Sequence, residues 1–196
     1  MAFHFQYNKT YLQTLNKALL VRKNALPTLK AKESALRLEV KKAREETERL
    51  RTKLSELLAS TEPLIRLFSE FPKELVRLSE VKIGQKKVAG IKTPVLEELE
   101  LSETLFGRIS SPAWFPNGLD RLKSVLNIHV SIRLSEQKNA IIEHARKKTT
   151  QKVNLYEKVQ IPELDEALRK IKRFLEDDEN LAKSSQKILK ARLAVA

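Results

Sequence analysis

Along the first arm of the chain, residues 1–62, hydrophobic residues recur at alternating steps of three and four. Eleven of the 14 positions on this stripe are apolar, and the polar ones are Arg22, Glu33 and Thr47. The 14 positions are Leu12, Leu15, Leu19, Arg22, Leu26, Leu29, Glu33, Leu36, Val40, Ala43, Thr47, Leu50, Leu54 and Leu57. A 3.5-residue repeat of this length is typical of a coiled-coil seam, so one long helix with a partner helix is predicted.

Two prolines, one inside the first arm and one at its end, bear on the shape of the predicted helix. Pro27 lies inside the first arm without changing the phase of the stripe. It indicates either a kink in one helix or a helix that starts there, and the unbroken stripe on both sides favours the kink. Thr61 and Pro63 predict the end of the arm, because Thr caps helices and Pro suits a new first turn.

A second arm, residues 119–196, shows the same stripe from Leu164 onward. Six of its eight positions are apolar, and they are Leu164, Leu168, Ile171, Leu175, Asp178, Ala182, Ser185 and Leu189. The phase is less regular between residues 127 and 160, and Pro162 predicts a kink or a register adjustment. Two arms joined by a compact insertion must run antiparallel if they pair, so the fold class is mainly α, a long antiparallel two-helix coiled coil.

The middle region, residues 63–118, holds all four glycines and four of the seven prolines. Residues 80–92 alternate polar and apolar side chains around a glycine-containing turn, which predicts a β-hairpin among short helices. An isolated hairpin is at best marginally stable, so this one must lean on the coiled coil or on a partner. Residues 110–118 are predicted to form a loop in which Trp114 and Phe115 either cover a local core, the favoured interpretation, or form an interaction hot spot.

Charge and composition narrow the class of protein. The net charge is +13, with +7 in residues 1–60, zero in 61–118 and +6 in 119–196. Basic arms attract acidic partners, whether protein, nucleic acid or anionic lipid. The absence of cysteine excludes a disulfide framework and a thiolate zinc site. The N-terminal residues do not resemble a signal peptide, and no apolar stretch is long enough to span a bilayer, so no direct membrane insertion is expected.

No motif for catalysis, cofactor binding or metal binding appears. Gly84 and Lys86 lack the other residues of a phosphate-binding loop, and the three histidines are scattered along the chain. The acidic run at residues 176–179 is interpreted as a solvated patch. A nucleic-acid-binding coiled coil and a generic helical scaffold remain alternatives. Acidic residues interleave with the basic ones and no aromatic platform is evident, so nucleic acid is not expected as a partner.

Three segments together resemble one protein family. Residues 150–164, which include Val153, Asn154, Glu157, Ile161 and Pro162, are similar to the C-terminal signature of the D subunit of V-type (vacuolar/archaeal-type) ATPases. The N-terminal stretch at residues 8–10 and 29–32 is similar to that family as well, as is the hairpin strand at residues 87–95. Glu33-Ser34, Asn180 and Pro27 depart from the family pattern, which suggests a divergent bacterial member.

The resemblance implies a non-catalytic axle in the central stalk of a rotary ATPase, cytoplasmic and peripheral to the membrane. The implied partners are the catalytic and non-catalytic ring subunits, the F subunit of the stalk and a funnel-shaped subunit that couples to the proteolipid ring. ATP would bind to the ring, so no cofactor is expected here. The candidate contact residues are Val81, Ile83, Val88, Gly90 and Ile91 of the hairpin, Asn154, Glu157 and Pro162 of the signature, and Lys187, Lys190 and Arg192 of the terminal segment.

Overall fold

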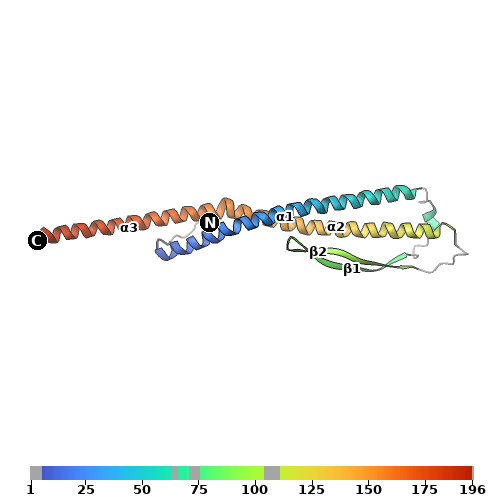
Figure 1. Cartoon of the computed structure of the whole chain (residues 1–196), viewed down its shortest axis with the longest axis horizontal. Helices are drawn as coiled ribbons and strands as arrows, with labels where there is room; N and C mark the ends of the chain where they lie inside the picture. Colours follow the sequence, from blue (N-terminus) through green and yellow to red (C-terminus); the bar gives the residue numbers. More distant parts are fainter. Residues whose placement is uncertain (1–5, 63–65, 71–75, 104–110, 196) are drawn as a thin grey trace. The chain divides into compact units, whose positions relative to one another are not determined.

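The computed structural model describes residues 6–62, 66–70, 76–103 and 111–195. In chain order these residues form helix α1 (Lys9–Thr61), the 3₁₀ turn η2 (Leu67–Glu70), strands β1 (Val76–Val88) and β2 (Ile91–Glu103), helix α2 (Phe115–Leu155), the π-helical segment η3 (Tyr156–Gln160) and helix α3 (Ile161–Val195) (Figure 1). The predicted mainly helical fold with a central hairpin is confirmed. The chain divides into two units, one of residues 1–33 with 148–196 and the other of residues 34–147.

Helix α1 follows the predicted seam closely. All 14 stripe positions are buried or half-buried. The backbone N–H of Tyr11 donates to Oδ1 of Asn8 at 2.6 Å, a side-chain cap that satisfies one of the unpaired amides at the helix start. The helix runs from Lys9 through Pro27 without a break, so a helix start at Pro27 is excluded.

In the first unit, the start of α1 packs against α3. Buried Leu15 and Leu19 of α1 meet Leu164, Leu168 and Ile171 of α3. Ion pairs join Lys9 to Glu179, Lys23 to Asp165 and Lys30 to Glu157. Residue numbers rise along one helix as they fall along the other, so the two helices are antiparallel.

The second unit repeats this arrangement with the rest of α1 and most of α2. Leu36, Val40 and Ile142 form its buried cluster. Cross-helix ion pairs join Arg44 to Glu143, Glu46 to Lys138 and Arg51 to Glu136, again in antiparallel order.

The hairpin of β1 and β2 lies beside this helix pair. Its strands pair from Val88 opposite Ile91 to Val76 opposite Glu103, well beyond the predicted 80–92. Ala89 and Gly90 have positive φ values of 49° and 80°, as a two-residue hairpin turn requires. The side chains of Val88 and Ile91 pack against Leu36, Val40 and Ile142. The hairpin is therefore in contact with the helix pair, along which it runs (Figure 1).

The second arm starts earlier than the predicted loop allowed. Helix α2 begins at Phe115, so the prediction of a loop through Gly118 is wrong for its last four residues. The ring of Trp114 meets Phe68 edge-on at 5.7 Å and Phe115 at 4.8 Å between ring centroids. Phe115 is buried and Trp114 half-buried, which agrees with the interpretation that the aromatic pair covers a local core.

The irregularity predicted near Pro162 takes the form of a π-helical turn. The N–H of Ile161 donates to the carbonyl of Tyr156, five residues earlier, and Pro162 follows directly. Proline has no N–H to donate, and its ring crowds the carbonyl four residues before it. A widened turn accommodates the missing hydrogen bond and relieves the steric clash. The predicted register adjustment is confirmed.

Candidate interaction surfaces of the helix pairs

The three polar positions of the α1 seam each meet a polar side chain of the second arm. Nε of Arg22 donates to Oε1 of Gln160 at 2.7 Å. Oγ1 of Thr150 donates to Oε1 of Glu33 at 3.3 Å. Thr47 is the third and lies in the second unit. Polar groups on an otherwise apolar seam favour the register in which they pair, and the effect is strongest for Thr47, which is buried, whereas Arg22 and Glu33 are half-buried.

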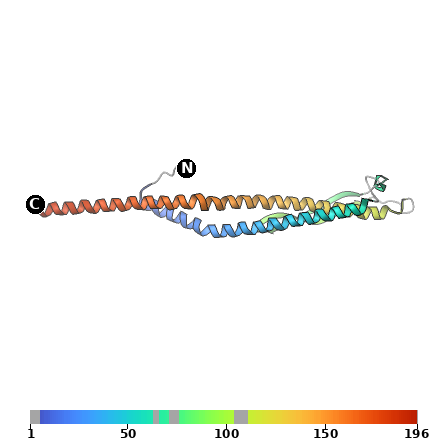
Figure 2. The ribbon, with the colours of Figure 1, turned by 90° about the horizontal axis from the view of Figure 1, so that it is seen from above.

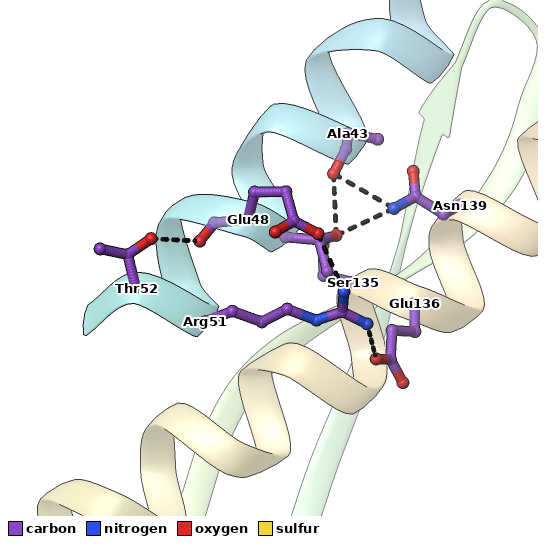
Figure 3. A network of polar contacts seen from close by, with 8 residues as sticks. Ala43, Glu48, Arg51, Thr52, Ser135, Glu136 and Asn139 are labelled. Atoms are coloured by element: carbon purple, nitrogen blue, oxygen red, sulfur yellow. Dashed lines mark hydrogen bonds and ion pairs between the residues drawn. The ribbon is translucent and has the colours of Figure 1, made fainter. Parts of the chain in front are cut away.

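The Thr47 contacts form a small buried network (Figure 3). Oγ1 of Thr47 donates to the carbonyl of Ala43 at 2.9 Å and lies 2.7 Å from Oγ of Ser135. Nδ2 of Asn139 donates to Oγ1 of Thr47 at 2.9 Å and to the Ala43 carbonyl at 3.2 Å. Thr47 is 4% exposed and Ser135 6% exposed. Hydrogen bonds this well buried link the two helices in one register.

A cluster of charged side chains, Glu48, Arg51 and Glu136, lies next to this network (Figure 3). Arg51 donates to Glu48 at 2.9 Å within α1 and to Glu136 of α2 at 2.8 Å. The hydrogen bond to Glu136 and the charge of Glu48 raise the pKa of Arg51 above its ordinary value. Arg51 and Glu48 are well exposed and Glu136 is 39% exposed, so solvent screening leaves these pairs a small effect on stability.

The candidate contact residues of the hairpin differ in how far they are exposed. Val88 and Ile91 are half-buried against the chain's own helix pair. Ile83, whose exposed fraction is 52%, and Gly90 at the turn face solvent, and Val81 is half-buried. Among these positions, Ile83 and Gly90 are therefore the most accessible to another protein.

The candidate residues of the C-terminal signature surround the π-helical turn. Asn154 and Pro162 are exposed, and Glu157 forms an ion pair with Lys30 of α1 at 2.6 Å. Glu157 thus links the two arms inside the first unit, from within the widened turn itself.

The last part of α3 extends past the start of α1 (Figure 1 and Figure 2). Of the predicted stripe, Leu164 to Leu175 is buried or half-buried, but the four positions from Asp178 to Leu189 are exposed. The seam therefore does not continue to Leu189 within the described residues, because α1 begins only at Lys9 and supplies no partner further along.

An apolar stripe nonetheless continues on this segment of α3. Phe174, Leu181 and Ile188 are seven residues apart, and their exposed fractions are 48%, 69% and 55%. The 3.5-residue period of the buried seam predicts the neighbouring stripe through Asp178 and Ser185 and not this one. The exposed Lys187, Lys190 and Arg192 accompany it, so the segment offers apolar and basic side chains together.

Comparison with known proteins decides the family. The family model described as the D subunit of ATP synthase matches residues 11–191. The chain belongs to the ATP synthase D subunit family. The resemblance seen in the three sequence segments is thereby confirmed.

Curated relatives agree with this family membership. The V-type ATP synthase D subunit of Borreliella burgdorferi is 29% identical over 173 residues, which cover 87% of this chain and 86% of the relative. The proteins of the same name from Chlamydia felis and Chlamydia pneumoniae are 27% and 26% identical over 157 residues, or 78% of this chain and about three quarters of each relative.

Metal-binding clusters and membrane-spanning helices are both absent from the residues that the structure describes. No group of three or more His, Asp or Glu side chains within them is arranged to hold a metal ion. None of the described helices is both long enough and apolar enough to cross a membrane.

Proposed function

We propose that the chain is the non-catalytic rotor axle of a V-type ATP synthase, which transmits torque between the ATP-processing ring and the ion-translocating ring in the membrane. In this role it is peripheral to the membrane on the cytoplasmic side. Its partners are the catalytic and non-catalytic ring subunits, the F subunit and the funnel-shaped subunit of the stalk.

The observation that carries the proposal is the polar pairing along the helix seam. A shaft under torque must resist sliding of one helix along the other, and apolar contacts alone permit such slippage. The contacts of Arg22 with Gln160, Glu33 with Thr150 and Thr47 with Ser135 occur at three levels of the antiparallel arms. A slip at the Thr47 level would leave buried hydroxyls unpaired, at a cost of about 1–3 kcal/mol each, whereas the half-buried groups at the other two levels would lose their partners at a smaller cost.

The exposed end of α3 supports insertion into the ring. Its exposed Leu181 and Ile188 offer apolar contact, and Lys187 and Lys190 add positive charge, whereas the ring of Phe174 packs against Tyr7 of the same chain at 4.6 Å between centroids. Contacts of exposed charges are weak and screened, which suits a surface that must pass from one ring subunit to the next. Each of the equivalent catalytic interfaces in the ring would meet a different side of the shaft. Because the contacts differ from one interface to the next, each interface would favour a different conformational state.

A reversible cross-link tests the proposal in the assembled complex. Leu189 is exposed at 59% and the chain has no cysteine, so Leu189→Cys gives a single thiol that can be joined to a thiol introduced on a ring subunit. We expect ATP hydrolysis to stop when the disulfide forms and to return when it is reduced. Leu20→Cys, an exposed position at 61% on α1, is the matched control for the effect of the thiol alone. Hydrolysis that continues at full rate in the cross-linked complex would refute an axle role.

A further inference from the structure

A basic groove lies on the second unit, where it borders the seam at Val40. Its volume is about 330 Å³, and α1 and α2 both contribute to its walls. The lining residues are Arg37, Val40, Lys41, Arg44, Glu45, Glu143 and Arg146. Four of these side chains are basic and two are acidic, so the groove carries an excess of two positive charges.

Three of the basic residues form a row along helix α1. Arg37, Lys41 and Arg44 stand at positions i, i+4 and i+7 of α1, which places them in one row on the same helix face. Neighbours in this row are about 4.5–6 Å apart along the helix axis. The side chains of Lys41 and Arg44 are 75% and 67% exposed, so these two are accessible to a partner.

The two acidic side chains of the groove are already engaged. Glu143 receives two hydrogen bonds from Arg146, at 2.6 and 3.2 Å, and lies 3.7 Å from Arg44. The hydrogen bonds from Arg146 keep the pKa of Glu143 below its ordinary value, so this carboxylate stays charged. Glu45 lies 3.9 Å from Lys41 at the long end of ion-pair distance. Both acidic side chains are thus paired within the groove, and its lining still carries an excess of two positive charges.

We propose that this groove binds an acidic segment of a neighbouring subunit, with carboxylates about one helical turn apart. The inference rests on the proposed function, since it assumes that other subunits surround the chain. Arginine suits such a partner because its planar fork pairs with a carboxylate through two hydrogen bonds. The basic excess also steers an acidic surface toward the groove before contact is made.

Features of the groove disfavour nucleic acid as the occupant. Glu45 and Glu143 would lie close to any phosphate backbone that entered it, and the described lining residues include no aromatic side chain on which a base could stack.

Carbodiimide cross-linking of the purified, assembled complex tests the proposal directly, because this reagent joins lysine amines to nearby carboxylates. We expect Lys41 to be joined to an Asp or Glu of another subunit, in a yield several-fold above that of Lys17 and Lys53. These two lysines are also exposed on α1 but lie outside the groove. Cross-links from Lys41 only to Glu45 of its own chain, or none at all, would overturn the proposal.

A charge-reversal pair supplies the second measurement. The double variant R37E/K41E should weaken retention of the cross-linked subunit about tenfold in a washed complex, as expected for the loss of two exposed charge contacts. The variant K17E/K53E changes the net charge by the same amount and should leave retention unchanged. Equal weakening by both variants, or release of bound nucleic acid by R37E/K41E alone, would overturn an acidic protein partner. If the chain does not assemble into the complex at all, the proposed function fails instead.

Discussion

Replacement of Thr47 by valine tests whether the buried polar network fixes the register of the helix pair. Valine has nearly the same shape as threonine but no hydroxyl, so packing changes little. The substitution removes the hydrogen bonds between Oγ1 of Thr47 and Ala43, Ser135 and Asn139. Asn139 keeps its bond to the Ala43 carbonyl at 3.2 Å, whereas the Ser135 hydroxyl loses its hydrogen bond across the seam.

The expected loss follows from the burial of these groups. Removing one partner of a buried hydrogen bond costs about 1–3 kcal/mol, since the remaining partner stays desolvated. Thr47 and Ser135 are both more than nine-tenths buried, and one of the two Asn139 bonds survives, so we expect about 2 kcal/mol. In a chain of this size, 1 kcal/mol corresponds to about 2–4 °C in Tm.

Urea unfolding followed by circular dichroism measures the change, with Thr52→Val as the matched control. Thr52 lies on the same helix and also donates to a carbonyl, that of Glu48, but it is exposed, so its replacement should change stability by less than about 0.5 kcal/mol. A Thr47→Val variant as stable as this control would refute the reasoning.

The triple variant Thr47→Val/Ser135→Ala/Asn139→Leu separates stability from register. Exchanging every member of a buried polar network for apolar groups can be nearly neutral, so it should recover most of the loss of Thr47→Val. Spin labels on the two helices should then show a broader distribution of distances, because slipped registers are no longer penalised. A triple variant less stable than the single variant would show that the network stabilises the fold and does not mainly select its register.

Three single sites allow further tests. Ile91→Asp should release the hairpin from the helix pair and speed proteolysis within residues 76–103, whereas Ile83→Asp, at an exposed position of the same hairpin, should not. Gly90→Val should destabilise the turn by about 1–2 kcal/mol in thermal unfolding, because a β-branched residue is strained at a φ of 80°; stability equal to the parent would contradict this. Hydrogen bonds from Arg146 lower the pKa of Glu143, so they add to the free energy of unfolding when this carboxylate is charged. This stabilisation is complete above the ordinary glutamate pKa, about 4.3, and is lost as the pH falls through the lowered pKa. Glu143→Gln should therefore lower stability at pH 7 and flatten its decline below about pH 4.3, and parallel pH curves for the two proteins would refute the assignment.

The helical seam of the first arm could be predicted from the order of residues alone. A 3.5-residue repeat places the same face of a helix toward its partner turn after turn, so the stripe from Leu12 to Leu57 predicted burial at every position. The three polar interruptions were visible as well. Their partners were not, because the identity of Gln160, Thr150 and Ser135 as partners depends on the antiparallel register, which both arms set together.

Local sequence patterns predicted only part of the hairpin and not the start of the second arm. Alternation around Gly90 predicted the turn, but Pro94 and the acidic residues after it concealed the rest of β2. A two-stranded sheet has only edge strands, where proline is tolerated. The helical signal at Phe115 was hidden because the prolines at 112 and 116 and Gly118 are typical of loops. Pro116 falls within the first turn of α2, where no N–H is missed.

Burial at the end of α3 depends on where its partner helix begins. The stripe through Asp178 and Leu189 has the same period as the buried stripe before it, yet it is exposed because α1 offers no helical residues before its start at Lys9. In the same way, the sequence marked Val88 and Ile91 as apolar but not whether they meet the chain's own helices. Periodicity is a property of one helix, whereas burial belongs to a pair of surfaces, and only the folded chain shows which surfaces meet.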